Sequence, residues 1–158
     1  FSSARLTSVK LNGTPVTEGA WNAAIAGELG VPVIMVAGDD ATVEEVSSLV
    51  GNVESAVVKW AHSFHSATTL QPEAAYDLIR DKAAMAVKNI KKYKPYRLKN
   101  PITVEMGFKN YRAVELLSYI SLFERTGSHT IRFSAKTMGE ASLIRTFILT
   151  YNGGNSTP

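Results

Sequence analysis

The sequence predicts an α/β fold in which a mixed or parallel sheet with flanking helices is followed by a smaller β-α-β-α lobe. Strand-like and helix-like segments alternate up to about residue 91, as in sheets whose strands are connected by helices. Residues 31–37 form a short, nearly continuous apolar run, which is typical of a strand covered on both faces. A basic stretch at 91–100 then separates a second series of strands and helices.

The first lobe opens with a strand over residues 5–11 and a tight turn, because Asn12-Gly13 is a preferred two-residue hairpin turn. A helix is expected from Thr17, whose hydroxyl can cap it, to Gly30, a residue that commonly ends helices. The remaining predicted elements are a strand over 31–37, a helix over 41–50 with an aspartate cap, a strand over 53–59 and a helix over 72–91 with Pro72 in its first turn.

The second lobe is predicted to contain strands over 102–108 and 129–135 and helices over 111–119 and 138–151. The domain organisation expected is therefore 1–92, then 101–151, then a disordered Gly-rich tail over 152–158. The chain opens within strand-like sequence and without an initiator methionine. We therefore expect it to be the C-terminal part of a longer protein.

Composition excludes several classes of protein. With 158 residues and 45% hydrophobic content, the chain can form one domain of common size with a real core. It has no cysteine, which excludes disulfides and thiolate zinc sites within this chain and fits a cytoplasmic protein. The longest apolar run is too short to span a bilayer, and no signal-peptide pattern is visible. A net charge of +3 does not by itself require an anionic partner.

Glu18 is the sharpest candidate for a functional residue. At 100° per residue it falls on the same arc of its predicted helix as four apolar residues, which are Trp21, Ala24, Ile25 and Leu29. A glutamate that faces the interior must be paired, protonated or bound to a cation, since burying it alone is costly. Asn22 lies one turn on and shares that face. The alternative is a solvated carboxylate in the first helical turn, where the helix dipole favours it.

Other polar residues are weaker candidates for a functional site. Asp39 and Asp40 follow an apolar strand, where two acids can bind a metal or an amine, but a helix cap with a solvated neighbour is the simpler interpretation. His62 and His65 have a spacing that can chelate a metal, although no cysteine or acid accompanies them and the segment reads as a Ser/Thr-rich loop. His129 has no evident partner.

Residues 88–99 contain six basic residues, two tyrosines and no acid. Basic residues interleaved with aromatics can bind nucleic acid. The same segment also fits a helix C-terminus followed by a solvated linker, and the rest of the chain offers no comparable basic face. Nucleic-acid binding is therefore the less favoured interpretation. The sequence contains neither a Gly-rich phosphate loop nor a nucleophile elbow.

The segment from Glu18 to Asp40 resembles the bacterial D-aminopeptidase family, self-compartmentalising zinc peptidases associated with dipeptide-transport operons. The residues that carry this resemblance are Glu18, Asn22-Ala23, Ala26-Gly27, Val31-Pro32-Val33 and Met35-Val36-Ala37-Gly38-Asp39-Asp40. Weaker matches continue through Asn52-Val53, Ala56, Val58-Lys59, Leu70, Pro72, Lys82, Phe108, Asn110-Tyr111, Ala113, Glu115, Phe133, Ala135, Met138, Glu140 and Ala141. The resemblance therefore covers about residues 15–151.

The resemblance implies an α/β fold and an active site with two zinc ions held by carboxylates and histidines. Of the family's metal ligands, only the glutamate that opens the helix maps onto this chain, as Glu18. Asn22 would orient a ligand or the substrate without binding the metal itself. The other ligands and the catalytic histidine belong to a segment upstream of residue 1. The chain is therefore expected to be inactive without that missing N-terminal part.

The resemblance further implies that the complete enzyme hydrolyses short peptides with N-terminal D-amino acids. The family assembles as a ring-shaped homodecamer, and residues 101–151 would supply much of the interface. Two other functions remain open from the residues. The chain can be a non-catalytic assembly or regulatory module of the same fold, or a weak nucleic-acid binder acting through 88–99.

Overall fold

The computed structural model describes residues 1–150, which form two compact units. Unit 1 consists of Phe1–Glu18 together with the chain from Leu98 onward, and unit 2 consists of Gly19–Arg97. This division differs from the expected 1–92 and 101–151, because the first strand belongs with the second half of the chain. The predicted tail at 152–158 lies outside the described residues. Within residues 1–150, no helix is both long enough and apolar enough to cross a membrane.

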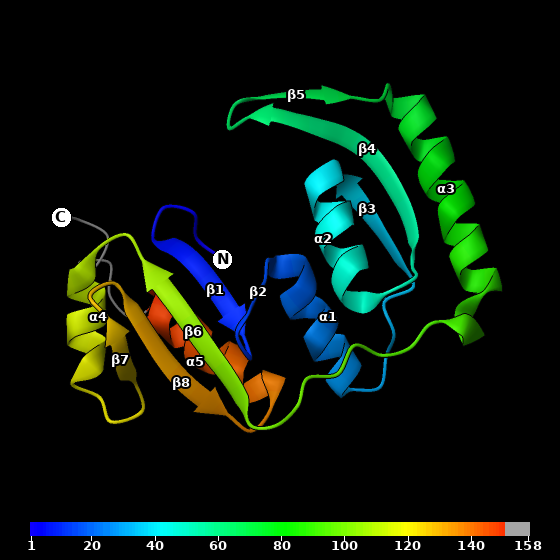
Figure 1. The fold of residues 1–158 in the computed structure, drawn as a ribbon. Coiled ribbons are helices and arrows are strands. Elements are labelled where there is room, and N and C mark those ends of the chain that lie inside the picture. The colour runs from blue at the N-terminus through cyan, green and yellow to red at the C-terminus, as the bar shows by residue number, and fades with distance from the viewer. Residues whose placement is uncertain (151–158) are drawn as a thin grey trace. The chain divides into compact units, whose positions relative to one another are not determined.

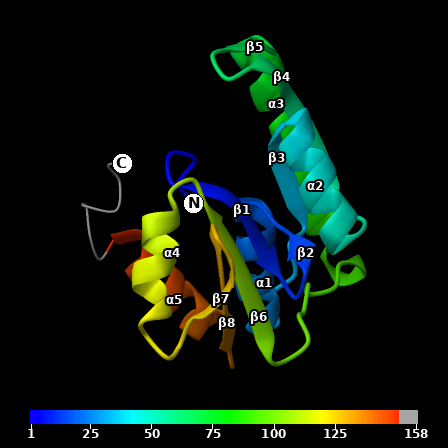
Figure 2. The ribbon, with the colours of Figure 1, turned by 60° about the vertical axis from the view of Figure 1, so that its left-hand side comes forward.

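Unit 1 is built on a five-stranded antiparallel sheet (Figure 1). The strands lie in the order β2 (Thr14–Pro15), β1 (Leu6–Leu11), β6 (Ile102–Phe108), β8 (Thr130–Ala135) and β7 (Glu124–Gly127). Helices α4 (Tyr111–Ser118) and α5 (Met138–Thr150) lie on one side of this sheet and contact β6 and β8 (Figure 2). The predicted strands and helices of the second lobe are therefore present.

The core of unit 1 lies between the sheet and these two helices. Alternate residues of the central strands are buried, while their neighbours stay partly exposed, as expected when only one face of an antiparallel sheet is covered. The buried side chains include Leu11, Ile102, Val104, Met106, Ile131, Phe133, Val114, Leu117 and Met138. The rings of Phe123 and Phe133 meet edge to face at 5.8 Å between centroids.

The expected turn at Asn12-Gly13 joins β1 to β2. Both residues have positive φ angles, of 49° and 84°, as a two-residue turn of this type requires. The Asn12 side chain also donates to the carbonyl of Lys99 and accepts from the backbone N–H of Thr103, each at 2.8 Å. The turn is thereby tied to the chain that enters β6.

The prediction that the first strand shares a parallel or mixed sheet with the next two strands is wrong. β1 pairs antiparallel with β6, with Val9 opposite Met106 and Leu11 opposite Val104. The physical reason is that β1 is apolar on one face only: Leu6, Val9 and Leu11 are buried, while the polar residues between them are exposed or partly exposed. One apolar face suits a sheet with one covered face rather than a doubly covered parallel sheet.

Unit 2 contains a mixed three-stranded sheet in the order β3 (Met35–Asp39), β4 (Glu54–Ser63) and β5 (Ser66–Thr69). β3 runs parallel to β4, and β5 returns antiparallel as a hairpin. Helices α2 (Asp40–Val50) and α3 (Pro72–Lys88) contact the sheet, and a short 3₁₀ turn at Ile90–Lys92 follows α3. Figure 1 shows β3 and β4 between the two helices. The α/β class predicted from the sequence is thus confirmed.

The apolar run at 31–37 is not a central strand in this unit. β3 begins only at Met35, lies at the edge of the sheet, and none of its residues is fully buried. Pro32 explains the late start, because proline lacks the N–H that a paired strand needs. β4 takes the central place because both other strands pair with it.

Helix α1 (Glu18–Glu28) ends as the sequence predicts. Gly30 adopts a left-handed conformation with φ 80°, and its N–H donates to the carbonyl of Gly27 at 3.0 Å. The N–H of Val31 donates to the carbonyl of Ala26 at 2.8 Å. This pair of bonds is the Schellman motif, which satisfies the last carbonyls of a helix.

Candidate functional site

Glu18 lies in the first turn of α1, and its side chain is 68% exposed. The expectation that it faces the interior is therefore wrong. The buried residues of the helix are Ala20, Trp21, Ala23, Ala24 and Gly27. Their mean direction lies roughly 150° around the helix from Glu18, at 100° per residue. Three of the five are alanines and one is glycine, so Trp21 is the one large side chain on the buried face by which an apolar arc could be located.

Asn22 is exposed and lies one turn after Glu18. The sequence therefore placed the two residues correctly on one face of the helix, but this face is the solvent-facing one. Side chains four residues apart on a helix are neighbours, so a ligand bound by Glu18 comes within reach of Asn22.

Within unit 1, the positive charge of the Arg145 side chain acts on Glu18. The guanidinium carbon of Arg145, on α5, lies 5.6 Å from the centre of the Phe1 ring. Burial lowers the pKa of Arg145 below its usual value, while the negative charge of Glu18 acts in the opposite direction. The positive charge of Arg145 therefore acts on Glu18 from a distant part of the sequence.

Sequence reasoning missed Arg145. It lies far from Glu18 along the chain, in a helix with no unusual pattern, and no local signal connects the two positions. The fold of unit 1 brings α5 beside the N-terminal segment, where the guanidinium of Arg5 donates to the carbonyl of Leu149.

Asp39 is the N-cap of α2, as the simpler interpretation proposed. Its carboxylate accepts the backbone N–H of Thr42 at 2.8 Å and lies 3.4 Å from the Lys59 ammonium. The hydrogen bond from Thr42 is the main cause that lowers the pKa of Asp39, and Lys59 adds to it. Asp40 is exposed in the first turn of the same helix. The two acids therefore have a structural explanation.

The three histidines lie on exposed segments. His62 belongs to β4, and the following hairpin turn carries His65, so the predicted loop is instead a β-hairpin. The Nε2 atom of His62 lies 2.7 Å from the hydroxyl of Thr68. His129 precedes β8, with its Nδ1 atom 3.0 Å from the hydroxyl of Ser128. In residues 1–150, no three histidines, aspartates or glutamates are grouped to hold a metal ion.

The basic segment 88–99 begins in the last turn of α3, passes through the 3₁₀ turn and continues without regular structure. Its lysines and Arg97 are exposed, whereas Tyr93 and Tyr96 are half-buried. Burial raises the pKa of Tyr96. The tyrosine rings are therefore not presented as an open stacking surface beside the basic residues. This arrangement agrees better with a helix end and a linker than with a nucleic-acid interface.

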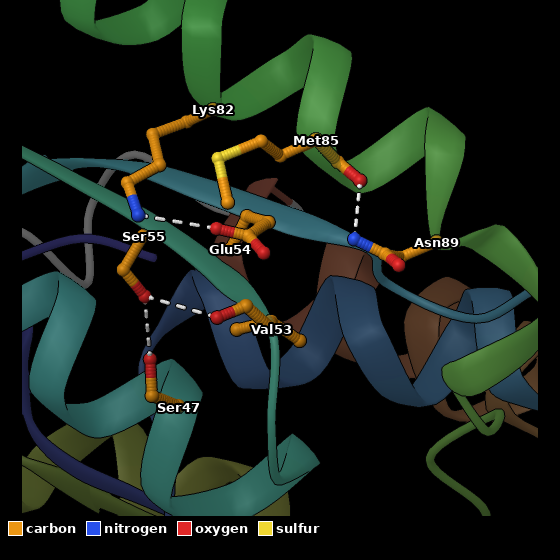
Figure 3. A network of polar contacts seen from close by, with 7 residues as sticks. All are labelled: Ser47, Val53, Glu54, Ser55, Lys82, Met85 and Asn89. Carbon is orange, nitrogen blue, oxygen red and sulfur yellow. Dashed lines mark hydrogen bonds and ion pairs between the residues drawn. The ribbon is translucent and has the colours of Figure 1, made fainter.

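A second polar network joins three elements of unit 2 (Figure 3). The ammonium of Lys82 on α3 donates to Glu54 on β4 at 3.1 Å, and both side chains are largely buried. The hydroxyl of Ser55 lies 3.3 Å from that of Ser47 on α2. These contacts tie both helices to β4, so we assign the network a structural role.

Comparison with known proteins shows clear relatives. A family model described as D-aminopeptidase matches residues 1–147. A D-aminopeptidase from Bacillus subtilis (strain 168) is 38% identical over 132 residues, which cover 83% of this chain and 48% of the relative.

A solved structure is also similar: "Zn-dependent D-aminopeptidase DppA from Bacillus subtilis, a self-compartmentalizing protease". The TM-score is 0.85 with 33% sequence identity, and the match covers 94% of this chain and 56% of that one. The chain thus spans about half the length of these relatives.

Proposed function

The chain belongs to the D-aminopeptidase family, and from this membership we propose that it is the C-terminal part of a zinc-dependent enzyme. The complete enzyme would hydrolyse short peptides that begin with a D-amino acid. The observation that carries the proposal is the family match over nearly the whole described chain, supported by structural likeness to a Zn-dependent relative. The two-zinc site is part of the proposal and rests on the family resemblance.

The residues of this chain do not form a zinc site by themselves. Catalytic zinc sites use three protein ligands with nitrogen, oxygen or sulfur donors. Around the start of α1 the described residues supply one carboxylate, and no group of three potential ligands occurs within residues 1–150. We therefore propose that Glu18 is one metal ligand and that the other ligands lie in the polypeptide that corresponds to the remaining half of the relatives.

The position of Glu18 supports this role. A ligand shared with another part of a protein has to be accessible, and this side chain is exposed at the start of a helix. In this proposal Asn22, which is exposed one turn on, would orient a ligand or the substrate. Because the site is incomplete in this chain, the chain alone is expected to be inactive.

Self-assembly is the remaining part of the proposal. The solved relative is described as self-compartmentalizing, which supports a homo-oligomer for the complete enzyme. The family resemblance favours a decameric ring, with the segment 101–151 contributing much of the contact.

The test compares this chain alone with the same chain joined to its upstream half. Bound zinc is measured by mass spectrometry of the metal, and activity by hydrolysis of D-Ala-D-Ala. We expect zinc and activity only in the joined protein. Full activity of the isolated chain would overturn the incomplete-site proposal. A joined protein that assembles without zinc or activity would identify a non-catalytic module.

A single substitution tests the assigned ligand. Glu18→Gln in the joined protein removes one anionic zinc donor. We expect zinc affinity or activity to fall by at least about tenfold, because losing even a residue that only hydrogen-bonds a metal ligand costs about that much. Glu28→Gln makes the same change at the other end of α1 and should leave both quantities unchanged. Equal behaviour of the two variants would remove Glu18 from the metal site.

A further inference from the structure

A row of four charged residues crosses the sheet of unit 1. Lys10 on β1 lies opposite Glu105 on β6, Glu105 lies opposite Arg132 on β8, and Arg132 lies opposite Glu124 on β7. Residues directly opposite each other on neighbouring strands point to the same face. From β1 to β7 the signs therefore alternate as plus, minus, plus, minus. We refer to these four residues as the charged row.

Ion pairs hold the charged row in place. The ammonium of Lys10 lies 2.7 Å from Glu105, and Arg132 contacts both oxygens of Glu124, at 2.7 and 3.1 Å. The hydrogen bond with Glu124 is the main cause that raises the pKa of Arg132, and Glu105 adds to it from the other side. Each central charge therefore has an opposite charge next to it. The row is an ordered pattern rather than four independent side chains.

The charged row is accessible in the middle of its sheet face. The side chains of Lys10, Glu105, Arg132 and Glu124 are 38%, 26%, 43% and 63% exposed. The neighbouring positions carry small or hydroxyl residues, namely Ser8, Gly107 and Thr130 on one side and Thr103 and Ser134 on the other. Along these strands, the positions on either side of the row therefore carry no long side chain. A second surface can approach the charges directly.

Two hollows open on this face, with volumes of about 790 and 390 Å³, and both are lined by Thr103 and Arg132. The larger hollow is also lined by Leu122, which is 46% exposed. The face thus combines charges with an exposed apolar side chain at its edge, a mixture that protein interfaces use.

The order of the charges is self-complementary. Reversing plus, minus, plus, minus gives minus, plus, minus, plus, so a second copy turned around by a two-fold axis places opposite charges face to face. Lys10 of one copy then meets Glu124 of the other, and Glu105 meets Arg132. The axis has to run parallel to the strands, midway between β6 and β8. An axis along the row would oppose like charges and is disfavoured.

We propose that this face of unit 1 is a contact between two copies of this chain related by such a two-fold axis. The inference deepens the proposed self-assembly and rests on that part of the proposed function. Two-fold contacts use the same patch on both subunits, and a patch therefore has to complement itself. The charged row meets this requirement, whereas a row of one sign would repel its own copy.

The test uses a fully reversed variant, Lys10→Glu, Glu105→Lys, Arg132→Glu and Glu124→Arg in one chain. Its row is again self-complementary, so it should self-associate about as well as the natural chain. The natural and reversed rows oppose like charges, however, so the two proteins should not mix. Native mass spectrometry of an equimolar mixture, with one partner labelled with ¹⁵N, measures the fraction of mixed dimers.

A single substitution keeps the test independent of whether the reversed variant folds. Glu124→Lys lies on the exposed edge strand and turns two attractive contacts across the axis into repulsive ones. We expect dimerisation to weaken by about tenfold or more at low salt, and less at high salt. Glu44→Lys makes the same charge change on α2, outside the charged row, and should have no effect. Sedimentation equilibrium measures all three proteins.

The outcomes separate this inference from the proposed function. If the Glu124→Lys variant dimerises as well as the natural chain, and the natural chain mixes freely with the reversed variant, the proposed contact surface is overturned while self-assembly is left intact. A natural chain that stays monomeric at every concentration would overturn the contact surface as well. The zinc and D-Ala-D-Ala measurements on the joined protein are independent of both results.

Discussion

Glu18 and Asn22 show how the register of one helix decides what a residue can do. The spacing along α1 places both on one face, whichever face is buried. The large residues Ile25 and Leu29 suggested that this face points inward. The buried side is instead formed by Trp21 together with small residues at positions 20, 23, 24 and 27.

At Gly27 another backbone segment approaches the helix closely. A Cβ atom at this position would lie 1.8 Å from the carbonyl oxygen of Tyr96. Gly27→Ala should therefore destabilise the protein by at least about 1–3 kcal/mol, the cost of overpacking, despite the better helix propensity of alanine. Gly139→Ala is the control, since its nearest neighbour lies at 3.7 Å. Urea unfolding of both variants measures the difference, and equal free energies of unfolding would contradict the close contact.

Asp39 links residue chemistry to pH. Because its pKa is lowered in the folded state, its charged form contributes stability above the unfolded pKa, near 4, and this contribution is lost as the pH falls through the folded value. Asp39→Asn should be less stable than the natural protein at pH 7, and the difference should shrink at pH 3. Urea unfolding at both pH values tests this. A difference independent of pH would show that the charge plays no part.

At the scale of elements, local signals predicted most of the helices and strands. The Asn12-Gly13 turn, the helix end at Gly30 and the start of α3 at Pro72 are all present, because each depends on the backbone preferences of one or two residues. β3 differs because whether a strand lies in the centre or at the edge depends on which other strands pair with it. An apolar run cannot specify its partners.

The contact between α3 and β4 offers a prediction at this scale. Lys82 and Glu54 are 32% and 18% exposed, so removing one partner leaves the other charge partly buried and unpaired. Lys82→Met should lower the free energy of unfolding by about 1–3 kcal/mol. Glu54→Gln should lower it less in the Lys82→Met variant than in the natural protein, because the ion pair is already lost there. Thermal unfolding of the two single variants and the double variant measures this coupling.

Arg80→Met, Asp77→Asn and the double variant on the same helix provide the control for that cycle. Arg80 pairs with Asp77 at 2.7 Å, but both side chains are mostly exposed. Exposed pairs of this kind contribute about 0–1 kcal/mol. A coupling of the Lys82 pair no larger than that of the Arg80 pair would show that burial does not strengthen the contact.

At the scale of the whole molecule, the two units have separate cores. Unit 1 depends on the pairing of β1 with β6, which joins segments distant in the sequence. The cores of both units consist of apolar side chains, and no described residue with a polar or charged side chain is fully buried. Apolar packing therefore stabilises both cores of the described residues.

Metal removal gives a prediction at this scale. Treating the isolated chain with a chelator should leave its thermal unfolding midpoint unchanged, since the described residues do not assemble a group of three ligands. The joined protein should lose activity under the same treatment. A clear fall in the midpoint of the isolated chain would mean that this chain binds a structural metal.

The sequence by itself determined the α/β class, most element boundaries, the family and the pairing of Glu18 with Asn22 on one helical face. These follow from residue preferences and periodicity, which act over a few residues. Only the tertiary structure decided that this face is exposed, that Arg145 lies near Glu18, and that β1 pairs with β6. Contacts between distant segments are set by how whole faces pack, and no short stretch of sequence contains that information.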